Sequence, residues 1–364
     1  MFSETEKDVY SALFSPNPKT KQELTSELSN SSSAIHDALS SLIKQNRVVV
    51  TGEGNSAYEP AILAVVRNSH ILSRAASNPL AAYALKGCDT YIPRWISKSH
   101  LDLEILLYAY QNRLNTLLIG HTGVGKTHAI RWLSYILGTP YMRINLNGGT
   151  TVDDLVGQWV PANKPNKYIW VDGQLAAFMR NGGILVCDEL NASPADINMV
   201  FNPVLDDERR LVLVQKESEV LYAHPEFWLV STINPDGDYE GTKPMNHALR
   251  DRFQIIMNYH YELDIESKLI PDDALLHLIY KLRESSKIYT KVSTRTGIQV
   301  IKNRALYGAD TALELFISRF TRDEQPVVRE LASIMARTTA AKITAPPPTE
   351  DPITHTSTSS ATSA

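Results

Sequence analysis

The sequence predicts an α/β fold in which a parallel sheet lies between helices, followed by a region of helices alone. Short apolar runs alternate with helical or turn sequence, and the candidate strands are Thr116–Ile119, Tyr141–Leu146, Ile184–Cys187, Phe227–Thr232 and Phe253–Met257. Such alternation is typical of parallel sheets with helices on their faces. A glycine-rich loop follows the first strand, and only helical patterns occur beyond Tyr261.

The glycine-rich loop fits the phosphate-binding pattern G-x-x-x-x-G-K-[ST] without a mismatch. It consists of Gly120, His121, Thr122, Gly123, Val124, Gly125, Lys126 and Thr127, and His128 follows as a further candidate for nucleotide contact. A strand precedes it and an amphipathic helix follows, which is the context in which backbone amides and a helix N-terminus bind phosphate. We expect Lys126 to reach the β- and γ-phosphates and the Thr127 hydroxyl to bind Mg²⁺.

The third candidate strand, Ile184–Cys187, follows Gly183 and is followed in turn by two carboxylates, Asp188 and Glu189. The carboxyl ends of parallel strands face the ligand crevice of such folds. We expect Asp188 to hold Mg²⁺, directly or through water, and Glu189 to orient and deprotonate the attacking water. A base beside the metal ligand implies hydrolysis rather than transfer to another substrate. The alternative is a solvated acidic turn.

Two later positions complete the candidate site. Asn234 follows the fourth strand and would hydrogen-bond the γ-phosphate or the attacking water, although Asn-Pro is also an ordinary turn. Arg252 precedes the last strand, where an arginine can reach the γ-phosphate of a neighbouring subunit. The alternative for Arg252 is a surface ion pair with Asp251.

The first 66 residues predict a separate winged-helix-like module. Three helical patterns, Glu4–Phe14, Thr20–Leu28 and Ser31–Gln45, precede a short hairpin. A DNA reader usually presents a basic face, whereas this module is slightly acidic. A protein-docking or spacer role is therefore favoured over DNA binding.

The remaining boundaries follow from changes in pattern and composition. We expect a linker over 67–95, an α/β core over 96–260 with a hairpin insertion at about 151–173, a helical lid over 261–342, and a disordered Pro/Ser/Thr tail over 343–364. In the insertion, Trp159, Tyr168 and Trp170 flank a polar tip. These aromatic side chains are either exposed on the hairpin or packed at its base.

Composition excludes several classes of function. The chain has 364 residues and a net charge of −4, which gives no support for non-specific nucleic-acid binding. No apolar run has the length of a membrane span. The acidic, polar start predicts no signal peptide. Cys88 and Cys187 form no metal-binding pattern, so we expect a reducing, cytoplasmic location.

These elements, in this order, resemble the AAA+ ATPases. Several stretches resemble the MoxR-type branch, which includes the CbbQ/NorQ proteins, the cobaltochelatase small subunit and midasin. They are Asp188–Pro194, Ala223–Phe227 with Asn234-Pro235, Glu240–Thr242 before Leu249–Phe253, and Ser293–Arg295. The first is similar to the motif Asp-Glu-hydrophobic-Asn-x-x-Pro, and the last to a Ser-Pro-Arg motif. The resemblance covers roughly residues 90 to 320.

The resemblance implies an AAA+ P-loop NTPase core with a helical lid, and a role for each matching position. Gly120–Thr127 would be Walker A, Asp188 and Glu189 Walker B, Asn234 sensor 1, Arg252 the arginine finger acting in trans with Arg250 as runner-up, and Arg295 sensor 2. It also implies ATP, Mg²⁺, a homo-hexameric ring, and a hairpin that faces the pore or the client. The branch often pairs with a von Willebrand A-domain protein.

Three positions or segments depart from the family pattern. Ala192 stands where many relatives carry a basic residue, which puts a trans contact there in doubt. Thr294 replaces the usual proline before Arg295. The winged-helix-like module is not a standard part of the branch, so the choice of partner does not carry over.

We weigh three functions. The favoured one is an ATP-hydrolysing, chaperone-like motor that remodels a protein or metalloenzyme-type client. The alternative is a DNA-associated motor of the helicase, initiator or restriction type. A related restriction motor uses GTP, so the nucleotide itself stays open. The third is a nucleotide-gated scaffold without catalysis, against which the intact Glu189 argues.

Overall fold

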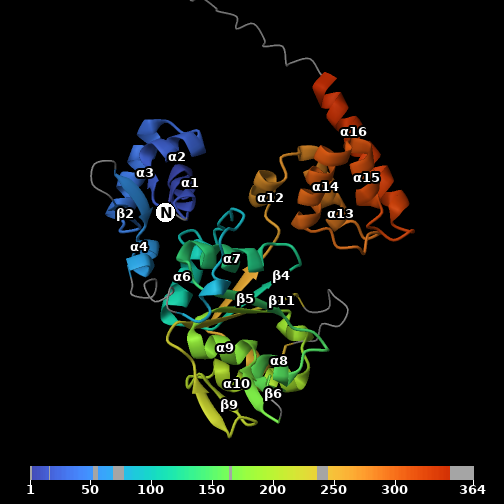
Figure 1. Ribbon diagram of the computed structural model, residues 1–364. Coiled ribbons are helices and arrows are strands. Elements are labelled where there is room, and N and C mark those ends of the chain that lie inside the picture. The colour runs from blue at the N-terminus through green and yellow to red at the C-terminus, as the bar shows by residue number, and fades with distance from the viewer. Residues whose placement is uncertain are drawn as a thin grey trace, which may run out of the picture. The chain divides into compact units, whose positions relative to one another are not determined.

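The computed structural model describes residues 2–15, 17–51, 56–68, 78–163, 166–235 and 245–344 (Figure 1). The chain divides into two compact units, Met1–Ile265 and Glu266–Ala364. The first contains an N-terminal module and an α/β core, and the second contains helices. Glu240–Thr242 lies outside the described residues.

The core is built on a five-stranded parallel sheet of order β12-β4-β11-β8-β5. The strands are β4 (Thr116–Gly120), β5 (Tyr141–Asn145), β8 (Gly183–Asp188), β11 (Phe227–Ile233) and β12 (Ile255–Tyr259). The predicted fold class is confirmed. The last strand starts two residues later than predicted, because the amide of Phe253 still bonds to the Arg250 carbonyl in the turn that ends α11 (His247–Arg250).

Helices cover both faces of this sheet (Figure 1). They are α6 (Asp102–Asn112) and α7 (Lys126–Leu137) on one face, and α8 (Val152–Val156), α9 (Gln174–Asn181) and α10 (Ala195–Leu205) on the other. In β8, Ile184 and Val186 join the core formed with α6 and α7, whereas Leu185 and Cys187 join the opposite core. Because both faces are buried, the strand is apolar throughout instead of alternating.

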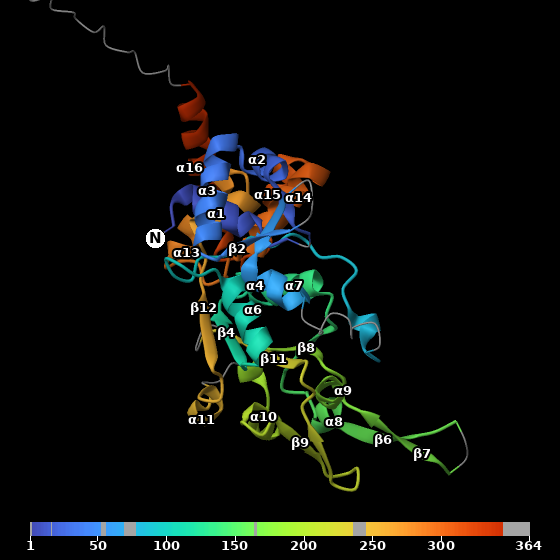
Figure 2. The same ribbon diagram turned by 90° about the vertical axis from the view of Figure 1, so that its left-hand side faces the viewer.

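Two antiparallel hairpins lie on the side of the sheet that carries α8 to α10 (Figure 2). The first pairs β6 (Gly157–Pro161) with β7 (Tyr168–Asp172), and the second pairs β9 (Arg210–Leu213) with β10 (Glu219–Tyr222). The short helix η3 (Leu190–Ala192) follows β8. The indole Nε1 of Trp159 donates to the carbonyl of Gln215, at 2.9 Å, and so joins the two hairpins.

The aromatic side chains of the first hairpin differ in environment. Trp159 is 46% exposed and Tyr168 is 64% exposed, whereas Trp170 packs against the core of α9 and α10. The rings of Trp159 and Trp170 meet edge to face at 5.7 Å. The hairpin therefore has both an apolar base and exposed aromatic surface.

The N-terminal module has the topology of a winged helix. Its elements are α1 (Glu4–Ala12), β1 (Lys19–Thr20), α2 (Lys21–Leu28), α3 (Ser32–Lys44), β2 (Val48–Thr51), β3 (Ala57–Pro60) and α4 (Ala61–Asn68). The three strands form an antiparallel sheet of order β1-β3-β2. Ser3 and Thr20 begin α1 and α2 with capping boxes, as their Ser/Thr-x-x-Glu spacing predicts.

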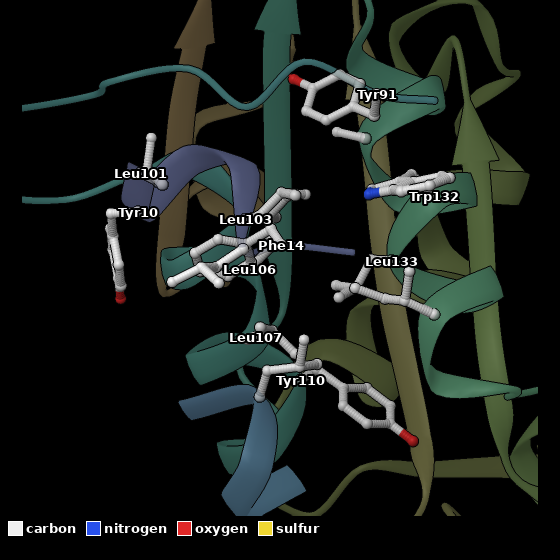
Figure 3. Packing of buried hydrophobic residues seen from close by; sticks show 14 of the residues in the cluster. Tyr10, Phe14, Tyr91, Leu101, Leu103, Leu106, Leu107, Tyr110, Trp132 and Leu133 are labelled. Atoms are coloured by element: carbon white, nitrogen blue, oxygen red, sulfur yellow. The ribbon is translucent and has the colours of Figure 1, made fainter. Parts of the chain in front are cut away.

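This module packs on the core through α6 and the segment before it. Tyr10 and Phe14 lie in the same apolar cluster as the α6 and α7 side chains, as Figure 3 shows. Arg47 donates to the Glu104 carboxylate at 2.6 Å and stacks over the Tyr10 ring at 5.0 Å. Phe2 meets Trp95 edge to face at 5.5 Å. The cationic side chain of Arg47 is thus directed into the core.

The second unit is helical, as predicted for the lid. After α12 (Leu263–Leu269), which spans the division between the units, it contains α13 (Asp273–Glu284), α14 (Thr294–Tyr307), α15 (Ala309–Ile317) and α16 (Gln325–Thr344). Its hydrophobic core is separate from those of the first unit. Glu266 is 1% exposed, and its carboxylate accepts hydrogen bonds from Arg283 and Thr294. Among the residues that the structure describes, the helices offer no apolar segment that could span a bilayer.

Candidate functional site

The glycine-rich loop lies between the carboxyl end of β4 and the start of α7, and β4 has β11 and β12 as its neighbours. Gly125 is the N-cap of α7 and has φ +105°, and Gly123 has φ +76°. Residues with a side chain rarely adopt these backbone angles. The two glycines therefore allow the backbone to turn tightly into the helix. The result is a helix N-terminus at the carboxyl edge of the sheet.

Three carbonyl groups at the start of this loop accept hydrogen bonds from side chains. The Lys126 ammonium donates to the carbonyls of Gly120 and, at 3.1 Å, His121. The Tyr261 hydroxyl donates to the Thr122 carbonyl at 2.9 Å. In a planar trans peptide the N–H points opposite to the C=O. The N–H groups that follow these three carbonyls therefore point away from the Lys126 and Tyr261 donors.

Arg94 holds a later carbonyl of the loop, that of Val124. The same guanidinium donates to the Glu262 carboxylate at 3.0 Å and to the His260 carbonyl at 2.9 Å. Arg94 is only 5% exposed. It therefore links the segment before α6 to the phosphate loop and to the end of β12.

A buried carboxylate, Asp102, supports this arrangement. It accepts from the hydroxyls of Tyr91 and Tyr259 and, at 3.0 Å, from the amide of Arg94. Burial raises the pKa of Asp102 from 3.8 to about 6, although the hydrogen bonds from Tyr91 and the Arg94 amide act in the opposite direction. The ring of His128 meets Tyr91 edge to face at 5.5 Å, and its Nε2 lies 2.9 Å from the Asp89 carbonyl oxygen.

Asp188, at the end of β8, is 4% exposed and lies beside Thr127. The Thr127 hydroxyl is 3.3 and 3.4 Å from its two carboxylate oxygens. Thr232 donates to Oδ1, and Arg143 forms an ion pair with Oδ2. A hydroxyl and a carboxylate that lie side by side provide the hard oxygen ligands that Mg²⁺ prefers. The donor set therefore fits the magnesium ion that the sequence implies.

Glu189 follows in a strained conformation, with φ +59°. A non-glycine residue in the left-handed region costs of order 1 kcal/mol or more, and such strain clusters at functional sites. Asn234 lies nearby, and its side-chain Oδ1 accepts from the Lys126 ammonium at 3.2 Å. Its backbone carbonyl accepts from the side-chain Nδ2 of Asn191 at 3.3 Å. The Asn191 Oδ1 is buried and has no hydrogen-bond partner among the residues that the structure describes.

Arg252 lies two residues beyond the end of α11. Its Nε donates to the Asp206 carboxylate at 2.6 Å and its Nη1 to the Ala248 carbonyl at 2.7 Å. The ion pair considered from the sequence involved Asp251, and the partner is instead Asp206. Arg250 is exposed. A cavity of about 530 Å³ adjoins Arg252 and is lined mainly by charged residues.

Arg295 belongs to the second unit, where it is exposed in the first turn of α14. The contacts of the first unit bring together Lys126, Thr127, Asp188 and Asn234. They leave Arg252 bound to Asp206 within its own chain.

Sequence reasoning missed four side chains at this site: Arg94, Tyr261, Thr232 and Arg143. Thr232 stands two residues before Asn234, so its placement at the same strand end could have been inferred from alternation along β11. Arg143 is the central residue of β5 and shares a face of the strand with Asn145 at its carboxyl end, so alternation offered the same signal. Arg94 and Tyr261 lie outside the strands and carry no local signal.

Comparison with known proteins adds independent evidence. A model of the AAA domain (dynein-related subfamily) matches residues 115–253. Protein CbbQ of Hydrogenophilus thermoluteolus is 31% identical over 174 residues, which are 48% of this chain and 63% of CbbQ. An uncharacterised protein of Staphylococcus haemolyticus is 32% identical over 186 residues, covering 49% of this chain and 70% of that protein.

A further match is to midasin of Dictyostelium discoideum, which is 34% identical over 165 residues. These residues are 45% of this chain and 3% of midasin. The chain thus spans less than two thirds of CbbQ and a small part of midasin.

Proposed function

The chain belongs to the AAA+ ATPases of the MoxR/CbbQ type, a family of ATP-hydrolysing enzymes, and we propose that it hydrolyses ATP with Mg²⁺ to remodel a protein client. One observation carries the proposal. Motif residues up to 108 positions apart in sequence meet at the carboxyl edge of the sheet, where Lys126 donates to Asn234 and Thr127 contacts Asp188.

Binding would use the phosphate loop and the start of α7. The backbone N–H groups of the loop would donate to the phosphate oxygens, and the helix dipole would favour the negative charge. Lys126 would exchange its contacts with backbone carbonyls and Asn234 for the β- and γ-phosphates. Thr127 and Asp188 would hold Mg²⁺, which supplies charge neutralisation at the phosphates when bound.

Hydrolysis would use Glu189 as the base. Its position directly after Asp188 would place its carboxylate beside the γ-phosphate, where it would accept a proton from the attacking water. Asn234 would orient the same water or the γ-phosphate through its side-chain amide. The nucleotide itself is tested by competition between ATP and GTP.

Assembly would complete the site. We propose that Arg252 reaches the γ-phosphate of a neighbouring subunit in a homo-hexameric ring, and that Arg295 acts as sensor 2 from the lid. Arg252 would first release Asp206, and its guanidinium would then pair with the γ-phosphate in place of the carboxylate. Loss of the γ-phosphate on hydrolysis would then reverse the exchange and change the contact between subunits.

The client would meet the exposed surface of the two hairpins. Trp159 and Tyr168 present aromatic area on the first hairpin, and the bond from Trp159 to Gln215 would transmit force to the second. We propose a protein client, with a von Willebrand A-domain protein as one candidate partner. Since Cys88 and Cys187 are both free thiols, we also propose a cytoplasmic location.

The DNA-associated alternative lacks a supporting observation. Arg47, a basic residue between α3 and β2 of the winged helix, is bound to Glu104 of the core. The test is the ATPase rate of the full chain with and without double-stranded DNA, beside its mass by light scattering with and without ATP. Assembly with ATP and no effect of DNA supports the proposal, and stimulation by DNA would replace it with the alternative.

A further inference from the structure

The edge strand β5 directs a cation toward Asp188. In the parallel register, Arg143 pairs with Val186 and Asn145 pairs with Asp188. Paired residues share a face of the sheet, and residues two apart along a strand share it as well. Arg143 and Asp188 therefore both lie on the face that α7 covers.

The two side chains form an ion pair between Arg143 Nη2 and Asp188 Oδ2. The other polar contacts of this carboxylate are hydroxyls, from Thr127 at 3.3 and 3.4 Å and from Thr232. The Asp188 side chain is 6% exposed and the Arg143 side chain 48% exposed. Within the described part of the chain, Arg143 is the one cation paired with this buried carboxylate.

A buried carboxylate is costly unless a cation or hydrogen bonds compensate its charge. The hydroxyls of Thr127 and Thr232 supply hydrogen bonds but no charge. A divalent cation held by Thr127 and Asp188 would take over the compensation, and it would meet the guanidinium at the same carboxylate. Two cations that draw on one carboxylate compete for it.

We propose that Arg143 is a positioning residue that serves as the counter-ion of Asp188 before nucleotide binds and yields this carboxylate to Mg²⁺ afterwards. The inference rests on the proposed role of Asp188 as a magnesium ligand. The side chain of Arg143 is half-exposed and stands on β5, the edge strand of the sheet in the described residues, so it has a route to solvent. Arg143 thereby sets the Mg²⁺ concentration at which the site fills.

The experiment compares the full-length wild type with Arg143→Met, Arg143→Lys and the matched control Arg131→Met, which removes an exposed arginine of α7. A fluorescent ADP analogue is bound at increasing Mg²⁺ concentration. We expect Arg143→Met to lower the half-saturating Mg²⁺ concentration about tenfold. This is the low end of the changes in metal affinity that follow substitution of residues in contact with metal ligands. Arg143→Lys should lie between, and Arg131→Met should match the wild type.

A second measurement, the melting temperature without nucleotide or Mg²⁺, does not depend on turnover. Arg143→Met should lower it, because Asp188 is left buried without a counter-ion. Adding Asp188→Asn to that variant should restore most of the loss.

The outcomes separate the two proposals. If the Mg²⁺ dependence is the same in Asp188→Asn as in the wild type, the assigned role of Asp188 fails. If Asp188→Asn abolishes the dependence and Arg143→Met leaves it unchanged, the inference about Arg143 fails. A higher Mg²⁺ requirement in Arg143→Met would also overturn it and assign Arg143 to the phosphates.

Discussion

The raised pKa of Asp102 predicts a measurable dependence of stability on pH. Asp102 is fully buried, and it joins Tyr91, the Arg94 backbone and Tyr259 behind the phosphate loop. Burial is the largest cause that raises its pKa from 3.8 to about 6. The substitution that tests this is Asp102→Asn, which keeps the shape and cannot titrate.

The sign of the effect follows from proton binding. Since the folded state binds the proton more tightly than the unfolded state, protonation stabilises the fold as pH falls. This contribution is fully present below the unfolded pKa and is lost as pH rises through about 6. For pKa values of 3.8 and about 6, the free energy of unfolding gains about 1 kcal/mol between pH 7 and pH 5, and at most about 3 kcal/mol at lower pH.

The assay is urea unfolding at pH 7 and pH 5, followed by tryptophan fluorescence. All five tryptophans lie between residues 95 and 228, so the signal reports on the first unit. Subtracting the free energy of unfolding of Asp102→Asn from that of the wild type cancels the titration of all other groups. The matched control is Asp196→Asn, at an exposed position. A difference that stays constant between the two pH values, or that moves against the wild type at pH 5, would refute the reasoning.

Three further predictions concern docking, assembly and the client. Arg47→Met should lower the free energy of unfolding by about 2 kcal/mol, between the values for exposed and buried ion pairs. The double variant with Glu104→Gln should cost less than the sum of the single changes in a urea double-mutant cycle, and strict additivity would contradict the pairing. Arg252→Ala should keep nucleotide affinity and lower turnover; mixed with wild-type subunits it should reduce activity non-linearly, whereas a linear loss would exclude a trans role. Trp159→Ala should leave basal hydrolysis near normal and abolish stimulation by a client, which equal stimulation would disprove.

Local patterns explain what the sequence predicted. The phosphate loop is a pattern of eight adjacent residues with a strand before it and a helix after it. Gly120 to Thr127 could therefore be placed from local sequence alone. The three central strands β4, β8 and β11 were found because burial on both faces makes them continuous apolar runs. Asp188 then followed from its position at a strand end.

Contacts between distant segments explain what the sequence could not predict. Arg94 reaches Glu262, 168 residues away, and nothing in either neighbourhood marks the pair. Arg252 has Asp251 beside it, but pairs with Asp206, 46 residues away. The β9–β10 hairpin was missed because Glu217 and Ser218 provide its left-handed turn, where glycine or asparagine is the usual signal.

The central claim is that Glu189 activates water for hydrolysis at a site assembled from Lys126, Thr127, Asp188 and Asn234. The most direct measurement is a single-turnover assay with γ-labelled ATP and Mg²⁺, in wild type and Glu189→Gln, beside the amount of nucleotide bound. The account predicts that the variant binds ATP as the wild type does and retains it, with phosphate release at least 100-fold slower, within the range for loss of a general base. Phosphate release at the wild-type rate by Glu189→Gln would contradict it.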